Sequence, residues 1–139
     1  MSSALDRLHP VVVHHIVNTL GWPSLRALQE EAAGPVLDGA DAVLLAPTAG
    51  GKTEAAVFPL LTAMDTQRWS GLSVIYVCPL KALLNNLLPR LSGYAAWLGR
   101  RAANQRLGWT TRRLAYFVQQ RRRDFDVDLT QRLEHLPGR

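Results

Sequence analysis

A glycine-rich segment followed by a lysine and a threonine is the part of this sequence that points most directly to chemistry. Residues 50–53 read Gly-Gly-Lys-Thr. Consecutive backbone N–H groups of residues 50–52 can bind a phosphate chain, because small residues let the backbone approach closely. In such a loop Lys52 would reach the β- and γ-phosphates, and the Thr53 hydroxyl would join the Mg²⁺ shell. The strict form of this pattern begins with glycine, where the chain has Ala46.

The segments on either side of this loop favour a phosphate site over an ordinary glycine turn. Residues 42–46 form a short apolar run between turn-forming residues, which predicts a buried strand. Residues 54–64 predict a helix that kinks at Pro59. A glycine loop between a strand and a helix is the context that such a motif requires.

Further elements complete the expected fold. Residues 72–78 predict a second buried strand, and residues 81–91 predict a helix with its leucines on one side. Two strands joined by a helix indicate a βαβ unit with parallel strands. Two helices are expected before it, one over residues 11–20 and one from about Pro23, so the fold class is α/β.

Three segments together resemble a known family. Residues 46–53 resemble motif I of superfamily 2 helicases, usually written A-x-T-G-x-G-K-T. Residues 21–29, Gly-Trp-Pro-Ser-Leu-Arg-Ala-Leu-Gln, are similar to the Q-motif region. Residues 79–83, Pro-Leu-Lys-Ala-Leu, resemble motif Ia in the form seen in Lhr-like DEAD/DEAH-box helicases. Their order implies the N-terminal part of the first RecA-like lobe, an incomplete P-loop NTPase fold.

The resemblance implies roles for individual residues. It implies that ATP and Mg²⁺ are the cofactors and that nucleic acid is the partner, with Lys52 and Thr53 acting in catalysis and Thr53 holding Mg²⁺ through its hydroxyl. The implied ATP-binding residues are Gln29, Thr48, Ala49, Gly50, Gly51, Lys52 and Thr53, and the implied nucleic-acid contacts are Pro79, Leu80, Lys81 and Ala82. Without the resemblance, Gln29 is equally an amide on a helix surface, Thr48 a loop hydroxyl and Lys81 a solvated charge at a helix start.

Two parts that this family needs for ATP hydrolysis have no counterpart in the sequence. No Asp-Glu dipeptide is present, and the length leaves no room for a second lobe with its arginines. The acidic residues 124–128 do not replace the dipeptide, because residues 119–123 before them are not an apolar strand. We therefore expect ATP binding with little hydrolysis by this chain.

The charge is distributed unevenly and suggests a boundary. Residues 1–99 carry a net charge of −1 and residues 100–139 carry +6, all of the excess as arginine. We expect a partial ATP-binding lobe over 1–99 and an arginine-rich tail over 100–139 that is helical or disordered. In the tail Arg112, Arg113 and three further arginines alternate with aromatic residues, a composition suited to nucleic acid or to non-specific polyanion binding.

Composition limits the remaining possibilities. Of the 139 residues, 47% are hydrophobic and 19% charged, which is typical of a globular domain. A single cysteine and the absence of a membrane-length apolar run favour a cytoplasmic protein without membrane contact. Two alternatives to a helicase fragment stay open. One is a non-enzymatic module that binds nucleic acid through the tail, and the other is a nucleotide-binding regulatory subunit docked on the rest of a helicase or a larger complex.

Overall fold

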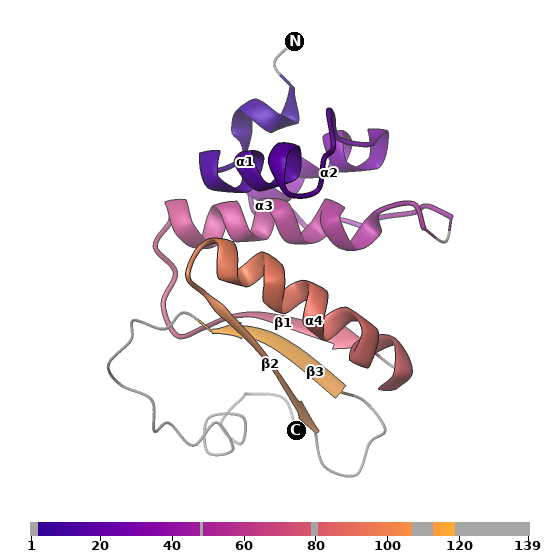
Figure 1. The fold of residues 1–139 in the computed structure, drawn as a ribbon, viewed down its shortest axis with the longest axis vertical. Helices are drawn as coiled ribbons and strands as arrows, with labels where there is room; N and C mark the ends of the chain where they lie inside the picture. Colours follow the sequence, from indigo (N-terminus) through magenta and orange to yellow (C-terminus); the bar gives the residue numbers. More distant parts are fainter. Residues whose placement is uncertain (1–2, 48, 79–80, 107–112, 119–139) are drawn as a thin grey trace.

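Two helices, α3 (Lys52–Thr66) and α4 (Lys81–Trp97), lie between the N-terminal helices and a small sheet (Figure 1). The computed structural model describes residues 3–47, 49–78, 81–106 and 113–118. In chain order the elements are η1 (Ala4–Arg7), α1 (Pro10–Asn18), α2 (Ala27–Leu37), α3 (Lys52–Thr66), β1 (Leu72–Cys78), α4 (Lys81–Trp97), β2 (Arg101–Arg106) and β3 (Arg113–Val118). None of the helices in the described ranges is long and apolar enough to span a membrane.

The N-terminal helices begin at residues whose chemistry suits a helix start. Pro10 is the first residue of α1, where its missing N–H costs no hydrogen bond, and the ring of His9 accepts from the Val11 N–H at 3.2 Å. The helix predicted from Pro23 begins later, at Ala27. Pro35 does not break α2, which continues to Leu37.

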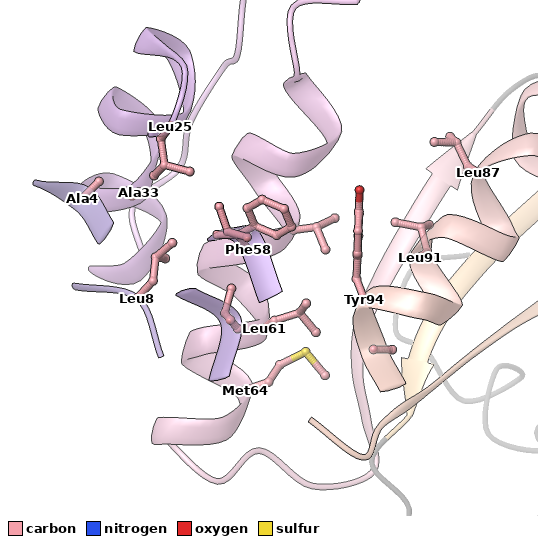
Figure 2. Close-up of a cluster of buried hydrophobic side chains, with 14 of the residues drawn as sticks. Ala4, Leu8, Leu25, Ala33, Phe58, Leu61, Met64, Leu87, Leu91 and Tyr94 are labelled. Atoms are coloured by element: carbon pink, nitrogen blue, oxygen red, sulfur yellow. The ribbon is translucent and has the colours of Figure 1, made fainter. Parts of the chain in front are cut away.

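The core forms where α3 packs between α1, α2 and α4 (Figure 2). Phe58, Leu61 and Met64 on α3 are all buried, and Leu91 and Tyr94 approach them from α4. Each large apolar side chain buried in this way stabilises the fold by about 1.5–3 kcal/mol. Pro59 lies inside α3 and does not end the helix, as predicted, and buried side chains along α3 anchor it in the core.

The sheet has three strands in the order β1-β3-β2, and both outer strands pair antiparallel with β3. Leu72 at the start of β1 and Arg101 at the start of β2 both pair with Val118. The two outer strands therefore run in the same direction, joined by α4, with β3 between them.

The predicted parallel pairing of residues 42–46 with residues 72–78 is wrong. Residues 42–46 form no strand, and the side chains of Val43 and Leu45 are 84% and 83% exposed. A strand needs a neighbour for its backbone N–H and C=O groups, and in the described ranges β1 finds that neighbour in β3 instead. The strand predicted over 72–78 is confirmed with the same bounds, but it is not buried as predicted, because Ile75 and Val77 are 42% and 59% exposed.

The prediction of a helical or disordered tail is wrong for the two segments that form β2 and β3. Arg113–Val118 reads Arg-Leu-Ala-Tyr-Phe-Val, whose apolar and aromatic residues suit a strand. Pairing with β1 satisfies its backbone, and Ala102 of β2 packs against the core. Because arginines flank this short apolar run on both sides, the pattern of the sequence indicates a basic segment there. The rest of the predicted tail, residues 107–112 and 119–139, lies outside the described residues.

Candidate functional site

The glycine loop ends in a left-handed turn that starts α3. Gly51 is the N-cap residue, with φ +77°, and Ala49 also has a positive φ of 66°. A Cβ on Gly51 would lie 2.6 Å from Nε2 of Gln29, and one on Gly50 would lie 2.7 Å from Cβ of Ala46. The positive φ of Gly51 favours glycine, and at both positions an added Cβ would require the neighbouring side chain to shift.

Lys52, the first residue of α3, folds its side chain back over the loop. Its Nζ donates to the carbonyl oxygen of Ala46 at 2.6 Å and to that of Pro47 at 2.9 Å. The ammonium thus lies beside the first residues of the loop and stabilises the turn. The helix N-terminus next to it offers unpaired N–H groups and a partial positive charge.

Gln29 lies behind the loop and links α2 to it. Its side chain is buried at 2% exposure, its Oε1 accepts from the Arg26 N–H at 3.0 Å, and its Nε2 donates to the Gly51 carbonyl at 3.4 Å. Arg26 adds a second link, because its Nη1 donates to the Ala49 carbonyl at 2.5 Å while its guanidinium lies 5.9 Å from the Trp22 ring centroid. In this arrangement the Gln29 amide supports the loop.

A cavity of about 780 Å³ opens beside the loop. The predicted residues that line it are Ala49, Gly50, Gly51, Lys52 and Thr53, whereas Gln29 is not among its lining residues. Its remaining walls come from Trp22, Arg26, Leu44, Glu54, Ala56, Tyr76, Leu83, Leu87, Arg90 and Tyr94. A space of this size is within the range that small-molecule sites occupy. The residues present fit a nucleotide with its metal, since the loop amides, an ammonium and a hydroxyl meet at one place.

A buried carboxylate and its partners form the wall that sequence reasoning missed. Glu54, in the first turn of α3, is 6% exposed. Its Oε1 accepts from the Tyr94 hydroxyl at 3.0 Å and lies 3.4 Å from Nε of Arg90. Burial, and next the negative charge of Glu54, raise the pKa of Tyr94 above its ordinary value. The spacing of Leu87, Arg90 and Tyr94 on one helix face was the available signal for this wall.

The other predicted residues are only partly placed. Thr48, Pro79 and Leu80 lie outside the described residues. Lys81 begins α4, and Ala82 follows it at an exposed position. The described residues contain no group of three or more His, Cys, Asp or Glu side chains that could hold a metal ion by themselves.

Comparison with protein families identifies the relationship. The family model for DEAD/DEAH box helicase matches residues 26–134, a range that holds the loop, Gln29 and the Glu54 wall. The chain belongs to the DEAD/DEAH box helicase family. Neither the curated proteins nor the solved structures contain a match to it. Helicases of this family generally use ATP and Mg²⁺, and the helicase domain implies binding of nucleic acid.

Proposed function

We propose that this helicase-family chain binds ATP with Mg²⁺ in the cavity beside the glycine loop. The observation that carries the proposal is the loop itself: Gly51 caps α3 in a left-handed conformation, and Lys52 and Thr53 follow it directly on the cavity wall. The family generally uses this nucleotide and metal, and the arrangement of amides, ammonium and hydroxyl suits a polyphosphate.

The loop residues divide the binding of the phosphates between them. The backbone N–H groups of Gly51 and Lys52 would hold the inner phosphates, and the Thr53 hydroxyl would hold Mg²⁺. The Gly50 N–H donates to the Pro47 carbonyl at 3.0 Å and would have to leave it to join them. Thr48 and Ala49 are proposed as further ATP-binding residues of the loop. The magnesium ion supplies charge neutralisation and orientation of the phosphate oxygens when bound.

Lys52 changes partners when phosphate enters. In the structure its ammonium donates to two neutral carbonyl oxygens, those of Ala46 and Pro47. A phosphate oxygen carries a negative charge that attracts the ammonium more strongly than a neutral carbonyl oxygen does, so a phosphate oxygen displaces these carbonyls. The loop then opens on the side that Lys52 now closes.

Gln29 is proposed to read the adenine edge, as the resemblance implies for the Q-motif glutamine. Both ends of its amide now contact the protein, the Arg26 N–H and the Gly51 carbonyl. Because Gln29 is buried and does not line the cavity, base recognition requires its amide to move towards the cavity and to give up at least the longer of these bonds, the 3.4 Å bond to Gly51. This exchange would couple the base to the phosphate loop.

Pro79, Leu80, Lys81 and Ala82 are proposed to contact the nucleic-acid backbone. Support comes from the family match and from their place at and before the start of α4, whose Leu83 lines the nucleotide cavity. The order of the three motifs further supports a superfamily 2 helicase of the Lhr-like group. Because the chain has no Asp-Glu dipeptide, we propose binding without efficient hydrolysis for the 139 residues.

A second candidate function rests on charge. The net charge of +6 over residues 100–139 favours a nucleic-acid-binding role for that region, with or without a nucleotide. This role requires neither Lys52 nor the cavity. A Lys52 variant should therefore lose nucleotide binding and keep nucleic-acid binding by residues 100–139.

Titration of a fluorescent ATP analogue in the presence of Mg²⁺ tests nucleotide binding. Lys52→Ala is expected to weaken binding about tenfold or more, because the variant has no ammonium to bind a phosphate oxygen. Arg7→Ala is the control, since Arg7 pairs with Asp38 at 2.6 Å and is not among the residues of the cavity wall. Equal affinity of folded wild type and folded Lys52→Ala would overturn the proposed site.

A further inference from the structure

Arg90 is tied to the N-terminal end of α3 through Glu54, whose Oε1 contacts both Arg90 and Tyr94. Oε1 of Glu54 lies 3.4 Å from Nε of Arg90 and accepts the Tyr94 hydroxyl at 3.0 Å. Glu54 follows Lys52 by two residues, which is a rise of about 3 Å along a helix axis. The guanidinium is therefore tied to the first turn of α3 through Glu54, and Arg90 shares the cavity wall with Gly51 and Lys52 of the loop.

The burial of Glu54 explains why this contact is maintained. A carboxylate in the first turn is favoured by the helix dipole, but a charge at 6% exposure needs a partner. Arg90 supplies the opposite charge and Tyr94 a hydrogen bond. Because the Tyr94 hydroxyl is itself buried, the carboxylate cannot turn towards water without leaving it unsatisfied, so Arg90 is kept at the cavity wall.

The exposed part of Arg90 faces the same space as Lys52. Both residues line the cavity, and the Arg90 side chain is 48% exposed. Its contact with Glu54 is made through Nε, and its Nη groups form the planar fork that matches phosphate oxygens. The cavity wall thus joins an arginine fork to the ammonium of the loop.

The two sides of the cavity suit different parts of a nucleotide. Figure 1 shows α2 and α4 on opposite sides of α3. Trp22 and Arg26, next to α2, offer an aromatic ring and a stacked guanidinium, whereas α4 offers Arg90. With the loop between them, a nucleotide whose base lies on the α2 side directs its last phosphate towards α4.

We propose that Arg90 binds the terminal phosphate of a nucleoside triphosphate and makes this cavity prefer triphosphates to diphosphates. Glu54 and Tyr94 are positioning residues that hold the guanidinium at the wall. This inference rests on the proposed nucleotide site, and it assigns a cation from the same chain to the γ-phosphate. If Arg90 only ties α4 to α3, the ratio of ATP affinity to ADP affinity should be the same in Arg90→Ala as in the wild type.

Affinities for ATP and ADP, each with Mg²⁺, measured by competition against a fluorescent analogue test this assignment. The variants are Arg90→Ala, Arg90→Lys and Lys52→Ala, with Arg7→Ala as the control for removing an ion-paired arginine far from the cavity wall. Thermal unfolding of each variant is measured alongside. Arg90→Lys retains the positive charge and remains informative if Arg90→Ala does not fold.

Arg90→Ala is expected to weaken ATP binding about tenfold or more, while the affinity for ADP changes less than about twofold. Arg90→Lys is expected to recover part of the ATP preference, because lysine keeps the charge without the planar fork. Lys52→Ala is expected to weaken the binding of both ATP and ADP. Equal weakening of ATP and ADP in the Arg90 variants, or no weakening, would overturn this inference while leaving the nucleotide site intact. A wild type that binds neither nucleotide would overturn both.

Discussion

Nζ of Lys52 lies 2.6 Å from the carbonyl oxygen of Ala46. The residue at the start of the loop is thereby tied to the first residue of α3, so the ammonium closes the same loop that it is proposed to open for phosphate. Binding must replace this bond and the 2.9 Å bond to Pro47 before the ammonium reaches a ligand. We therefore expect the stability of the closed loop to reduce the affinity of the proposed nucleotide site.

Gly51→Ala is expected to destabilise the fold and to weaken nucleotide binding. The alanine would adopt a left-handed conformation at a cost of about 1–2 kcal/mol, and its Cβ would lie 2.6 Å from Nε2 of Gln29. Gly21→Ala is a matched control, since Gly21 has φ +68° but no neighbour within 4 Å. Urea unfolding and analogue titration measure both effects. Equal destabilisation of the two variants would show that the Gln29 contact has no consequence.

The sequence predicted the local parts of this site and missed the contacts between distant elements. Gly51, Lys52 and Thr53 are neighbours in the chain, so their placement at a helix start could be predicted from residue type alone. Glu54 and Tyr94 are 40 residues apart, and only the packing of α3 on α4 brings them together. No local pattern specifies that packing.

The same distinction explains the errors in the fold. The apolar run at 42–46 satisfies every local criterion for a strand, yet a strand forms only beside a partner. The Arg113–Val118 strand was overlooked because it lies among arginines, although its pairing with β1 decides the sheet. The strand Leu72–Cys78 was predicted correctly because its apolar and β-branched residues suit a strand beside either partner.

Tyr94 is expected to make stability depend on pH in the alkaline range. Because its pKa is raised in the folded state, chiefly by burial, the unfolded chain releases this proton first. The contribution of protonated Tyr94 to the free energy of unfolding is complete below the ordinary tyrosine pKa of about 10. Above that pH it decreases by about 1.4 kcal/mol per pH unit. Urea unfolding at pH 8 and pH 11 should show a smaller decrease for Tyr94→Phe than for wild type. Identical decreases would contradict the raised pKa of the buried Tyr94.

The chain of 139 residues is expected to hydrolyse ATP hardly above background. Hydrolysis in this family requires an acidic pair and further arginines to stabilise the transition state, and this sequence contains no Asp-Glu dipeptide. Phosphate release is measured with and without single-stranded nucleic acid. Nucleic-acid-stimulated release that disappears in Lys52→Ala would contradict this prediction and would require an acidic residue elsewhere in the chain.

Nucleic-acid binding by the basic region is expected to decrease steeply with salt, because each phosphate neutralised by an arginine releases counterions. Deleting residues 100–139 is unsuitable as a test, since it would remove β2 and β3, two strands of the sheet. Replacing Arg121, Arg122 and Arg123 by glutamine retains both strands. If these arginines bind phosphates, the log–log salt slope on single strands becomes shallower by about 0.7 for each phosphate that the variant no longer neutralises.

Fluorescence anisotropy at several salt concentrations compares wild type, this triple variant and Lys81→Ala, each with and without ATP. An unchanged slope in the triple variant would exclude those arginines as phosphate contacts. Lys81→Ala is expected to weaken a residual, ATP-sensitive affinity, because Lys81 begins α4 and the nearby Leu83 lines the nucleotide cavity. A Lys81→Ala variant with wild-type affinity at every salt and nucleotide concentration would leave the motif Ia contact without support.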